Sequence, residues 1–124
     1  MRRHAPYVLV VDAYPDGAEC ARDMLALHGF LVKTTASCAE AVAMTRAECP
    51  AAVVTDTRLP DGDGQTLADL LRAIARPVPA IIAIGSTPRQ ASDTFDAWFM
   101  KPAEPCQLAA TLRRYVPAPD CRCS

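Results

Sequence analysis

Two aspartates each follow a short apolar run, and a lysine stands late in the chain. Val8–Val11 leads into Asp12, and Ala51–Thr55 leads into Asp56, which Pro and Gly residues follow. Short Val-rich runs closed by such breakers are typical of buried strands in a parallel sheet. Because ligands collect beyond the carboxyl ends of these strands, we expect both carboxylates at one edge. A single aspartate there is more often a turn residue; the second aspartate and Lys101 favour a site.

Two carboxylates and an ammonium group at one edge form a candidate functional site. Lys101, anchored beside Pro102, can add a compact positive charge. The alternative is that Lys101 is an ordinary exposed lysine at a strand end.

Segments with strand and helix patterns alternate along the whole chain. Each helix pattern is bounded by Pro, Gly or a capping pair, such as Gly29 after the first helix and Ser37 with Glu40 before the second. This alternation predicts an α/β fold with a five-stranded parallel sheet covered on both faces. The expected strands are Tyr7–Val11, Phe30–Thr35, Ala51–Thr55, Ala80–Ile84 and Ala97–Met100, and the expected helices are Pro15–His28, Ser37–Glu48, Leu67–Ala75, the two-turn Pro88–Phe95 and Pro105–Val116.

Composition limits the class of protein. The chain has 124 residues, 51% of them hydrophobic and 22% charged, which is typical of one globular domain. We expect a single domain over residues 1–124, with a core of about 7–116 and a tail of 117–124. A net charge of −1 offers no footprint for nucleic acid or an acidic membrane. The early apolar run is too short for a signal peptide or a membrane span, so a soluble cytoplasmic protein is expected.

All six cysteines are expected to be reduced. No Cys-x-x-Cys pair and no Cys/His cluster with zinc spacing occurs. Cys20, Cys38, Cys49 and Cys106 stand singly in helix-like stretches. Cys121 and Cys123 lie in the Pro-containing tail, where their role stays open.

The ordered motifs resemble the receiver domain of two-component response regulators, over about Tyr7 to Val116. Val8–Asp12 resembles the family's first strand and acidic corner, Asp56–Gly64 its phosphoacceptor segment, and Met100–Pro102 the end of its fifth strand. The resemblance implies a doubly wound, flavodoxin-like sheet of order 2-1-3-4-5. It also implies that Asp56 accepts a phosphoryl group from a histidine kinase or phosphotransfer protein in a phosphorelay.

The resemblance further implies roles for the residues around Asp56. A carboxylate that attacks phosphorus depends on positioning and charge neutralisation. Mg²⁺ suits this work, because it is bound by one or two carboxylates and the phosphate, and it would be held by Asp12, Asp56 and the backbone carbonyl of Arg58. Lys101 would contact the phosphoryl oxygens, and a cis peptide bond would join it to Pro102.

Two departures from the family pattern bear on this site. The family normally has two consecutive acids after the first strand, and Ala13 replaces the second, usually a direct metal ligand. We therefore expect Mg²⁺ binding to be weak or absent. The family also places a Thr or Ser at the end of the fourth strand, to contact the phosphate. Strand alignment puts Gly85 at that position, whereas counting from Asp56 puts Ser86 there, and the two assignments stay open.

Two further residues have alternative interpretations. Arg58 is expected to be an exposed turn residue, but its guanidinium group could instead fold toward Asp12 and Asp56 and fill the space of a cation. Trp98 stands three residues before Lys101, where the family's switch aromatic would lie, and could equally be an ordinary core aromatic. The helix before it is shortened relative to the family.

The leading hypothesis is a stand-alone, non-enzymatic receiver that is phosphorylated on Asp56 and docks to a downstream protein. The alternative is a pseudo-receiver, a binding module with the fold but without phosphoryl transfer; Ala13 and Gly85 favour it. A flavodoxin-like ligand binder is the weakest hypothesis, because no phosphate-binding glycine loop is present.

Overall fold

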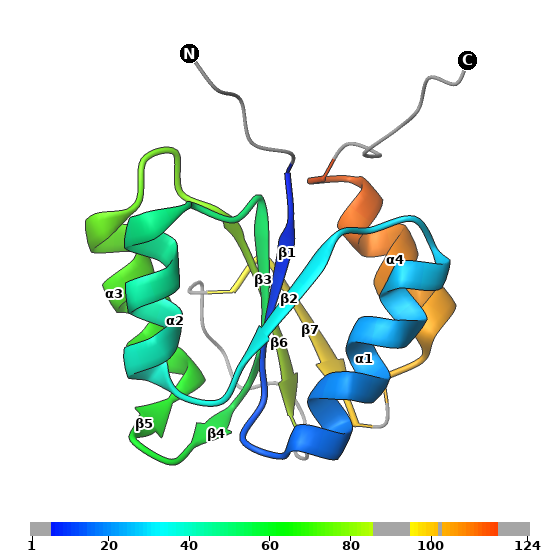
Figure 1. Ribbon diagram of the computed structural model, residues 1–124, viewed down its shortest axis with the longest axis horizontal. Coiled ribbons are helices and arrows are strands. Elements are labelled where there is room, and N and C mark those ends of the chain that lie inside the picture. Colours follow the sequence, from blue (N-terminus) through cyan, green and yellow to red (C-terminus); the bar gives the residue numbers. More distant parts are fainter. Residues whose placement is uncertain (1–5, 86–94, 102, 117–124) are drawn as a thin grey trace.

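Five parallel strands form the sheet in the order β2-β1-β3-β6-β7 (Figure 1). The computed structural model describes residues 6–85, 95–101 and 103–116. With the hairpin of β4 and β5 set aside, this is the expected doubly wound order 2-1-3-4-5, so the predicted fold class is confirmed. The strands of the sheet are β1 (Val8–Val11), β2 (Val32–Thr35), β3 (Ala52–Asp56), β6 (Ala80–Gly85) and β7 (Ala97–Met100).

The three central strands are almost continuously apolar because helices cover both of their faces. Every residue of β1 and β3 is buried, as are five of the six residues of β6. The register pairs Val8 with both Val32 and Ala52, and Ala52 with Ala80. β1, β3 and β6 therefore begin level with one another, which brings their carboxyl ends to one edge.

Local sequence signals set the helix boundaries. Pro15 opens α1, and Gly29, with a φ of 94°, follows its end, as expected. The Ser37 hydroxyl accepts the Glu40 N–H, but the Glu40 carboxylate bonds to Ala36 N and the Thr35 hydroxyl, so only half of the predicted capping box forms. The helices are α1 (Pro15–Leu27), α2 (Cys38–Ala47), α3 (Gly64–Ile74) and α4 (Pro105–Arg113).

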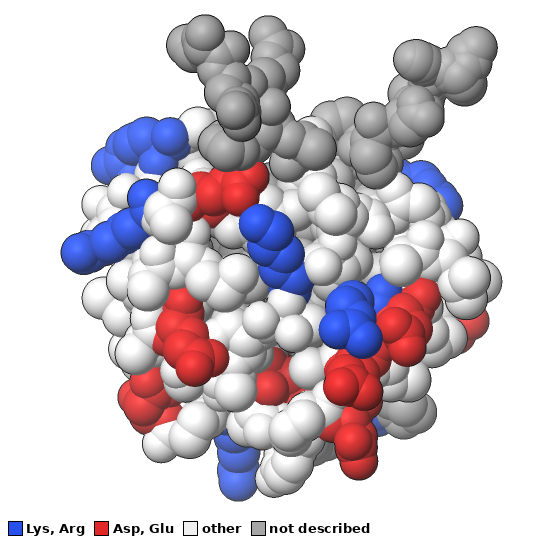
Figure 2. Space-filling model, in the orientation of Figure 1, with Lys and Arg blue, Asp and Glu red and all other residues white. Residues whose placement is uncertain are grey.

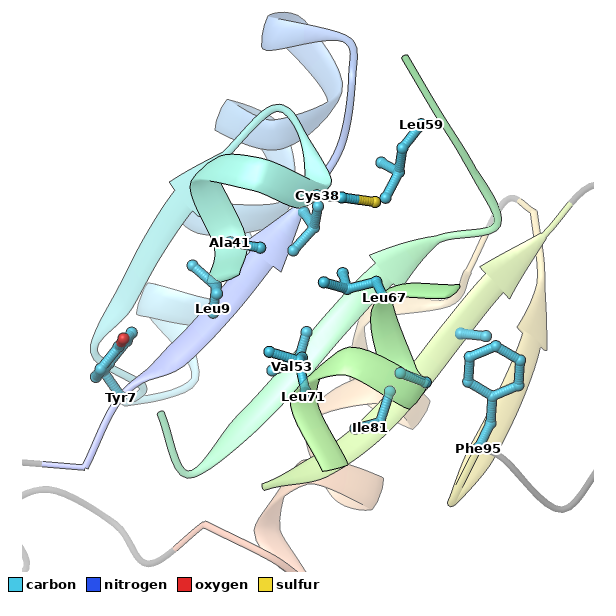
Figure 3. Close-up of a cluster of buried hydrophobic side chains, with 13 residues drawn as sticks. Tyr7, Leu9, Cys38, Ala41, Val53, Leu59, Leu67, Leu71, Ile81 and Phe95 are labelled. Atoms are coloured by element: carbon cyan, nitrogen blue, oxygen red, sulfur yellow. The ribbon is translucent and has the colours of Figure 1, made fainter. Parts of the chain in front are cut away.

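Two apolar clusters hold the layers together. α2 and α3 cover one face of the sheet, and α1 and α4 cover the other (Figure 1). Figure 3 shows the first cluster, in which Leu9, Val53 and Ile81 of the sheet meet Leu67 and Leu71 of α3. The second cluster joins alternate residues of the same strands to α1 and α4, and it includes Val10, Val54, Ile82, Leu108 and Leu112.

The structure adds one element that the sequence did not indicate. β4 (Arg58–Leu59) and β5 (Gly62–Asp63) form a short antiparallel hairpin where only a turn was expected. The predicted two-turn helix at Pro88–Phe95 lies, apart from Phe95, outside the described residues, and so does Pro102 with its predicted cis bond. Within the described part of the chain, no helix is long and apolar enough to span a bilayer.

The described cysteines are unpaired, in line with the prediction of reduced thiols. Cys20, Cys38, Cys49 and Cys106 are free. Burial raises the pKa of the Cys38 thiol to about 11, and the nearby Asp61 carboxylate adds to this effect. Cys38 therefore stays protonated and acts as a small apolar residue of the core. Cys121 and Cys123 lie outside the described residues.

Candidate functional site

The carboxyl edge of the sheet brings together the three residues singled out from the sequence. Asp56 ends β3, Asp12 follows β1, and Lys101 follows β7. All three line one cavity of about 50 Å³, whose walls include Val54 and Ile84. In Figure 2, Asp and Glu side chains are frequent over the lower half of the molecule, where the strands end. Two aspartates and one lysine therefore meet in this cavity.

Asp56 and Lys101 form a direct ion pair. The Lys101 Nζ donates to Asp56 Oδ2 at 2.9 Å. The Asp56 side chain is only 8% exposed, whereas that of Lys101 is 39% exposed. The other carboxylate oxygen, Oδ1, lies 3.5 Å from the backbone nitrogen of Arg58. Asp56 is thus a buried carboxylate whose charge is compensated by an ammonium group that reaches in from the rim.

Asp12 occupies the neighbouring corner, where α1 begins. Its Oδ1 accepts the Tyr14 N–H at 2.9 Å. A Cβ built on Gly17 would lie 2.7 Å from Asp12 Oδ2, closer than any real contact. A side chain at position 17 would therefore require the Asp12 carboxylate to shift from its present place.

The hairpin beyond Asp56 is tied to two helix ends by carboxylates. Asp61 accepts the N–H groups of Cys38 and Ala39 at 2.9 and 3.0 Å, and Asp63 accepts the Thr66 N–H at 2.8 Å. These backbone donors hold the pKa of the Asp61 and Asp63 carboxyls below their ordinary values. The Asp-x-Asp turn thus caps α2 and α3 and positions the loop that follows Asp56.

Arg58 does not fold toward the aspartates. Its side chain is exposed, and among the described residues its guanidinium group forms no ion pair. Lys101 compensates the charge of Asp56 instead. The exposed position expected for Arg58 is confirmed, and the alternative that it fills the cation space is wrong.

Comparison with known proteins identifies the family. Residues 8–112 match the response regulator receiver domain. The chain belongs to this family. It is 30% identical over 115 residues to an uncharacterized 14.6 kDa protein of Leptolyngbya boryana, a match that covers 87% of this chain and 88% of the relative.

Solved receiver structures have the same fold. A CheY-like receiver domain of Methylobacillus flagellatus aligns with a TM-score of 0.82 at 24% identity, over 90% of this chain and 99% of that one. The receiver domain of a sensor histidine kinase of Pseudomonas aeruginosa aligns with a TM-score of 0.78 at 26% identity, over 90% and 98% of the two chains, and holds a magnesium ion in its active site cleft. The protein is therefore a receiver domain of two-component signalling, a family whose members generally act as switches.

The acidic residues of this receiver do not complete a magnesium site of the family's kind. Ala13 contributes a methyl group where a carboxylate is expected, Lys101 already occupies one oxygen of Asp56, and Tyr14 N–H occupies one of Asp12. Among the described residues, no three His, Cys, Asp or Glu side chains converge on one point. Mg²⁺ prefers six oxygen ligands, several of them water. The residues present therefore do not fit the cation site that the resemblance implies.

The residue beside Asp56 on the next strand is Ile84. The register of β3 and β6 pairs Asp56 with Ile84, and Ile84 lines the cavity that holds Asp56 and Lys101. Gly85, one residue later, lies toward the opposite face, where an added Cβ would meet Trp98 and Thr57. Ser86 lies outside the described residues. Of the two positions that the sequence offered, Gly85 is thus placed on the Trp98 side of the strand, and the prediction for Ser86 stays a prediction.

Trp98 packs over Gly85 on the face away from Asp56. A Cβ at position 85 would lie 2.9 Å from Trp98 Cζ2 and 3.0 Å from Thr57 Cγ2, so the ring and the threonine flank the same spot. Phe95 meets the indole ring edge-on, with 5.7 Å between the centroids. The indole nitrogen is buried and has no hydrogen-bond partner among the described residues. Trp98 therefore packs beside Gly85 and Thr57, on the other side of the sheet from the Asp56 side chain.

Proposed function

We propose that this receiver is phosphorylated on Asp56 and passes the signal on by docking to another protein. The observation that carries the proposal is the ion pair between Asp56 and Lys101, 2.9 Å apart at the carboxyl edge of the sheet. Asp56 is the carboxylate that combines burial, a strand end and a cationic partner there. Aspartate is almost never fully buried unless it is paired, and the partner here is a lysine at the edge of the sheet where ligands collect.

In the proposed reaction, a carboxylate oxygen of Asp56 attacks the phosphorus of a phosphohistidine. The new O–P bond forms as the P–N bond breaks, and the imidazole leaves and takes up a proton from water. The transferred group carries negative charge on its three other oxygens. The Lys101 ammonium, already 2.9 Å from Asp56, would turn to these oxygens and compensate their charge.

Two exposed side chains next to the site support docking of a partner at this edge. Tyr14, two residues after Asp12, is 69% exposed, and Met100, next to Lys101, is 50% exposed. Tyr and Met are enriched at protein interfaces. A histidine kinase or phosphotransfer protein that delivers its phosphoryl group to Asp56 would contact both.

The second candidate function is a pseudo-receiver that binds a partner without phosphoryl transfer. Ala13 removes one acid, and Ile84 presents no hydroxyl group to the cavity. The two hypotheses differ in whether Asp56 ever carries a phosphoryl group. Receivers that transfer phosphoryl groups need the acceptor and the lysine, and this chain retains both.

The deciding experiment is intact mass spectrometry after incubation with acetyl phosphate and Mg²⁺. We expect one added phosphoryl group on the unaltered protein and none on Asp56→Asn. Asp69→Asn is the matched control, since it removes an exposed carboxylate of α3 that has no part in the site and should leave labelling intact. Absence of label on the unaltered protein, with acetyl phosphate and with a phosphorylated histidine kinase, would reject phosphorylation in favour of the pseudo-receiver.

A further inference from the structure

The segment between Asp56 and α3 forms a closed loop over residues Thr57–Asp63. At the base of this loop, the Gly64 N–H donates to the Thr57 carbonyl at 3.0 Å. A Cβ built on Gly64 would lie 2.9 Å from the Asp56 carbonyl oxygen, so the start of α3 lies directly against the residue that carries the site. In the middle of the loop, the buried Leu59 packs into the cluster between the sheet and α3. The base and the middle of the loop are therefore fixed by the sheet and the core.

The tip of the loop is bonded to α2 through Asp61. The two carboxylate oxygens of Asp61 accept the N–H groups of Cys38 and Ala39, the first two residues of α2, at 2.9 and 3.0 Å. The hairpin inside the loop has only two paired residues in each strand. Because a two-stranded hairpin is marginally stable by itself, we expect the bonds from Asp61 to be needed to keep the tip in place.

The loop presents a backbone donor to the Asp56 carboxylate. The Arg58 nitrogen lies 3.5 Å from Asp56 Oδ1, while Lys101 donates to Oδ2. A contact of this length is at most a weak hydrogen bond in the unmodified protein. Such contacts often tighten only when charge develops beside them during the reaction. The Arg58 N–H is therefore placed to serve the reaction at Asp56, provided that the loop holds its position.

We propose that Asp61 is a positioning residue for the reaction at Asp56. By tying the tip of the loop to α2, it keeps the Arg58 N–H beside Asp56 Oδ1, where this N–H donates to the negative charge that develops on the transferred phosphoryl group. The inference rests on the proposed phosphorylation of Asp56. Asp61 acts through the backbone of the loop and not by contact with the reacting atoms.

Capping of α2 is the simpler role for Asp61, and Ser37 separates the two roles. The Ser37 hydroxyl accepts the Glu40 N–H at 3.2 Å, so Ser37 caps the same first turn of α2 from the chain that precedes the helix. Loss of either cap should destabilise α2 to a similar extent. Only the loss of Asp61 also releases the tip of the loop.

The test compares Asp61→Ala with Ser37→Ala. The initial rate of labelling by acetyl phosphate is read by intact mass, at a temperature where thermal unfolding shows both variants to be folded. We expect Asp61→Ala to be labelled roughly tenfold more slowly than the unaltered protein, and Ser37→Ala at the unaltered rate. Asp61→Asn keeps one acceptor oxygen and should be labelled at an intermediate rate. Asp61 is exposed, so both of its variants should fold; if Asp61→Ala does not, Asp61→Asn replaces it in the comparison.

Three results would contradict the inference, and they separate it from the proposed function. An unchanged rate in Asp61→Ala would overturn the inference and leave the proposed function standing. Equal slowing of Asp61→Ala and Ser37→Ala would assign the effect to the stability of α2, and would overturn it in the same way. If neither acetyl phosphate nor a phosphorylated histidine kinase labels the unaltered chain, the proposed function is rejected and the inference with it.

Discussion

Gly85→Ala should expel Trp98 from its present position. The added Cβ would lie 2.9 Å from Trp98 Cζ2 and 3.0 Å from Thr57 Cγ2. Carbon atoms in good contact stay about 3.5–4.0 Å apart, so both contacts are too short by roughly 0.5–1 Å. Thr57 and Trp98 are both half-buried, but the β-branched Thr57 side chain is stiff about its first torsion. Trp98 is therefore the side chain that moves.

The loss of stability caused by Gly85→Ala follows from overpacking at position 85 and from the lost burial of Trp98. Forcing an extra carbon into a packed site costs about 1–3 kcal/mol of the free energy of unfolding. For a chain of this size, 1 kcal/mol corresponds to roughly 4 °C in the unfolding temperature, so a fall of about 4–12 °C is expected. Because the indole nitrogen is now buried without a partner among the described residues, its exposure to water should shift the emission of Trp98 to longer wavelength.

Thermal unfolding and fluorescence emission together provide the assay, since Trp98 is the single tryptophan of the chain. Gly62→Ala is the control, because the nearest atom to its added Cβ is Cys38 Sγ at 3.3 Å and Gly62 is exposed. In a Trp98→Leu background, Gly85→Ala should cost clearly less, since the two positions are coupled. An unchanged unfolding temperature together with unchanged emission would refute the packing of Trp98 over Gly85.

Three other predictions follow from the described contacts. Tyr7→Phe should lower the free energy of unfolding in urea by about 1 kcal/mol, because the buried Tyr7 hydroxyl donates to the Glu48 carbonyl; no change would contradict that bond. The lowered pKa of Asp61 stabilises the fold above about pH 4 and ceases to do so as the pH falls further, so Asp61→Asn should flatten the acid loss of stability in urea titrations at several pH values; an unaltered acid slope would contradict this. Ala13→Asp should strengthen Mg²⁺ binding, followed by Trp98 fluorescence; tight binding by the unaltered chain, unaffected by the change, would contradict the incomplete site.

Much of the fold could be predicted because its signals are local. The Val-rich run before Asp12, the Pro at position 15 and the Gly at position 29 each act within a few residues, and the structure has the strand, helix start and helix end that they predict. The hairpin of β4 and β5 could not be predicted, because a strand of two residues has no periodicity to detect.

The charged residues of the candidate site could be predicted from the sequence, whereas the apolar residue beside them, Ile84, could not. Asp12, Asp56 and Lys101 are recognisable by type and by their place at strand ends. Ile84 looks like any strand residue, and only the pairing of β3 with β6 shows that it lies beside Asp56. Both strands reach this pair at their fifth residue, a count that depends on knowing where each strand begins.

The ion pair between Asp56 and Lys101 could not be predicted from local sequence, because it depends on how the chain folds in three dimensions. Lys101 lies 45 residues after Asp56, and no local pattern shows whether it or the nearby Arg58 reaches the carboxylate. Arg58 is tied into the hairpin and its side chain is exposed, whereas β7 delivers Lys101 over the edge of the sheet. The order of the strands therefore determines that Lys101, and not Arg58, pairs with Asp56.

The most direct test of the central claim is to locate the modified residue. Borohydride reduces an aspartyl phosphate to homoserine with release of phosphate, and peptide mass spectrometry then identifies the position. After incubation with acetyl phosphate or a phosphorylated histidine kinase, the account predicts homoserine at position 56, and at no other aspartate. Homoserine at Asp12 or Asp61, or labelling that persists in Asp56→Asn, would contradict it.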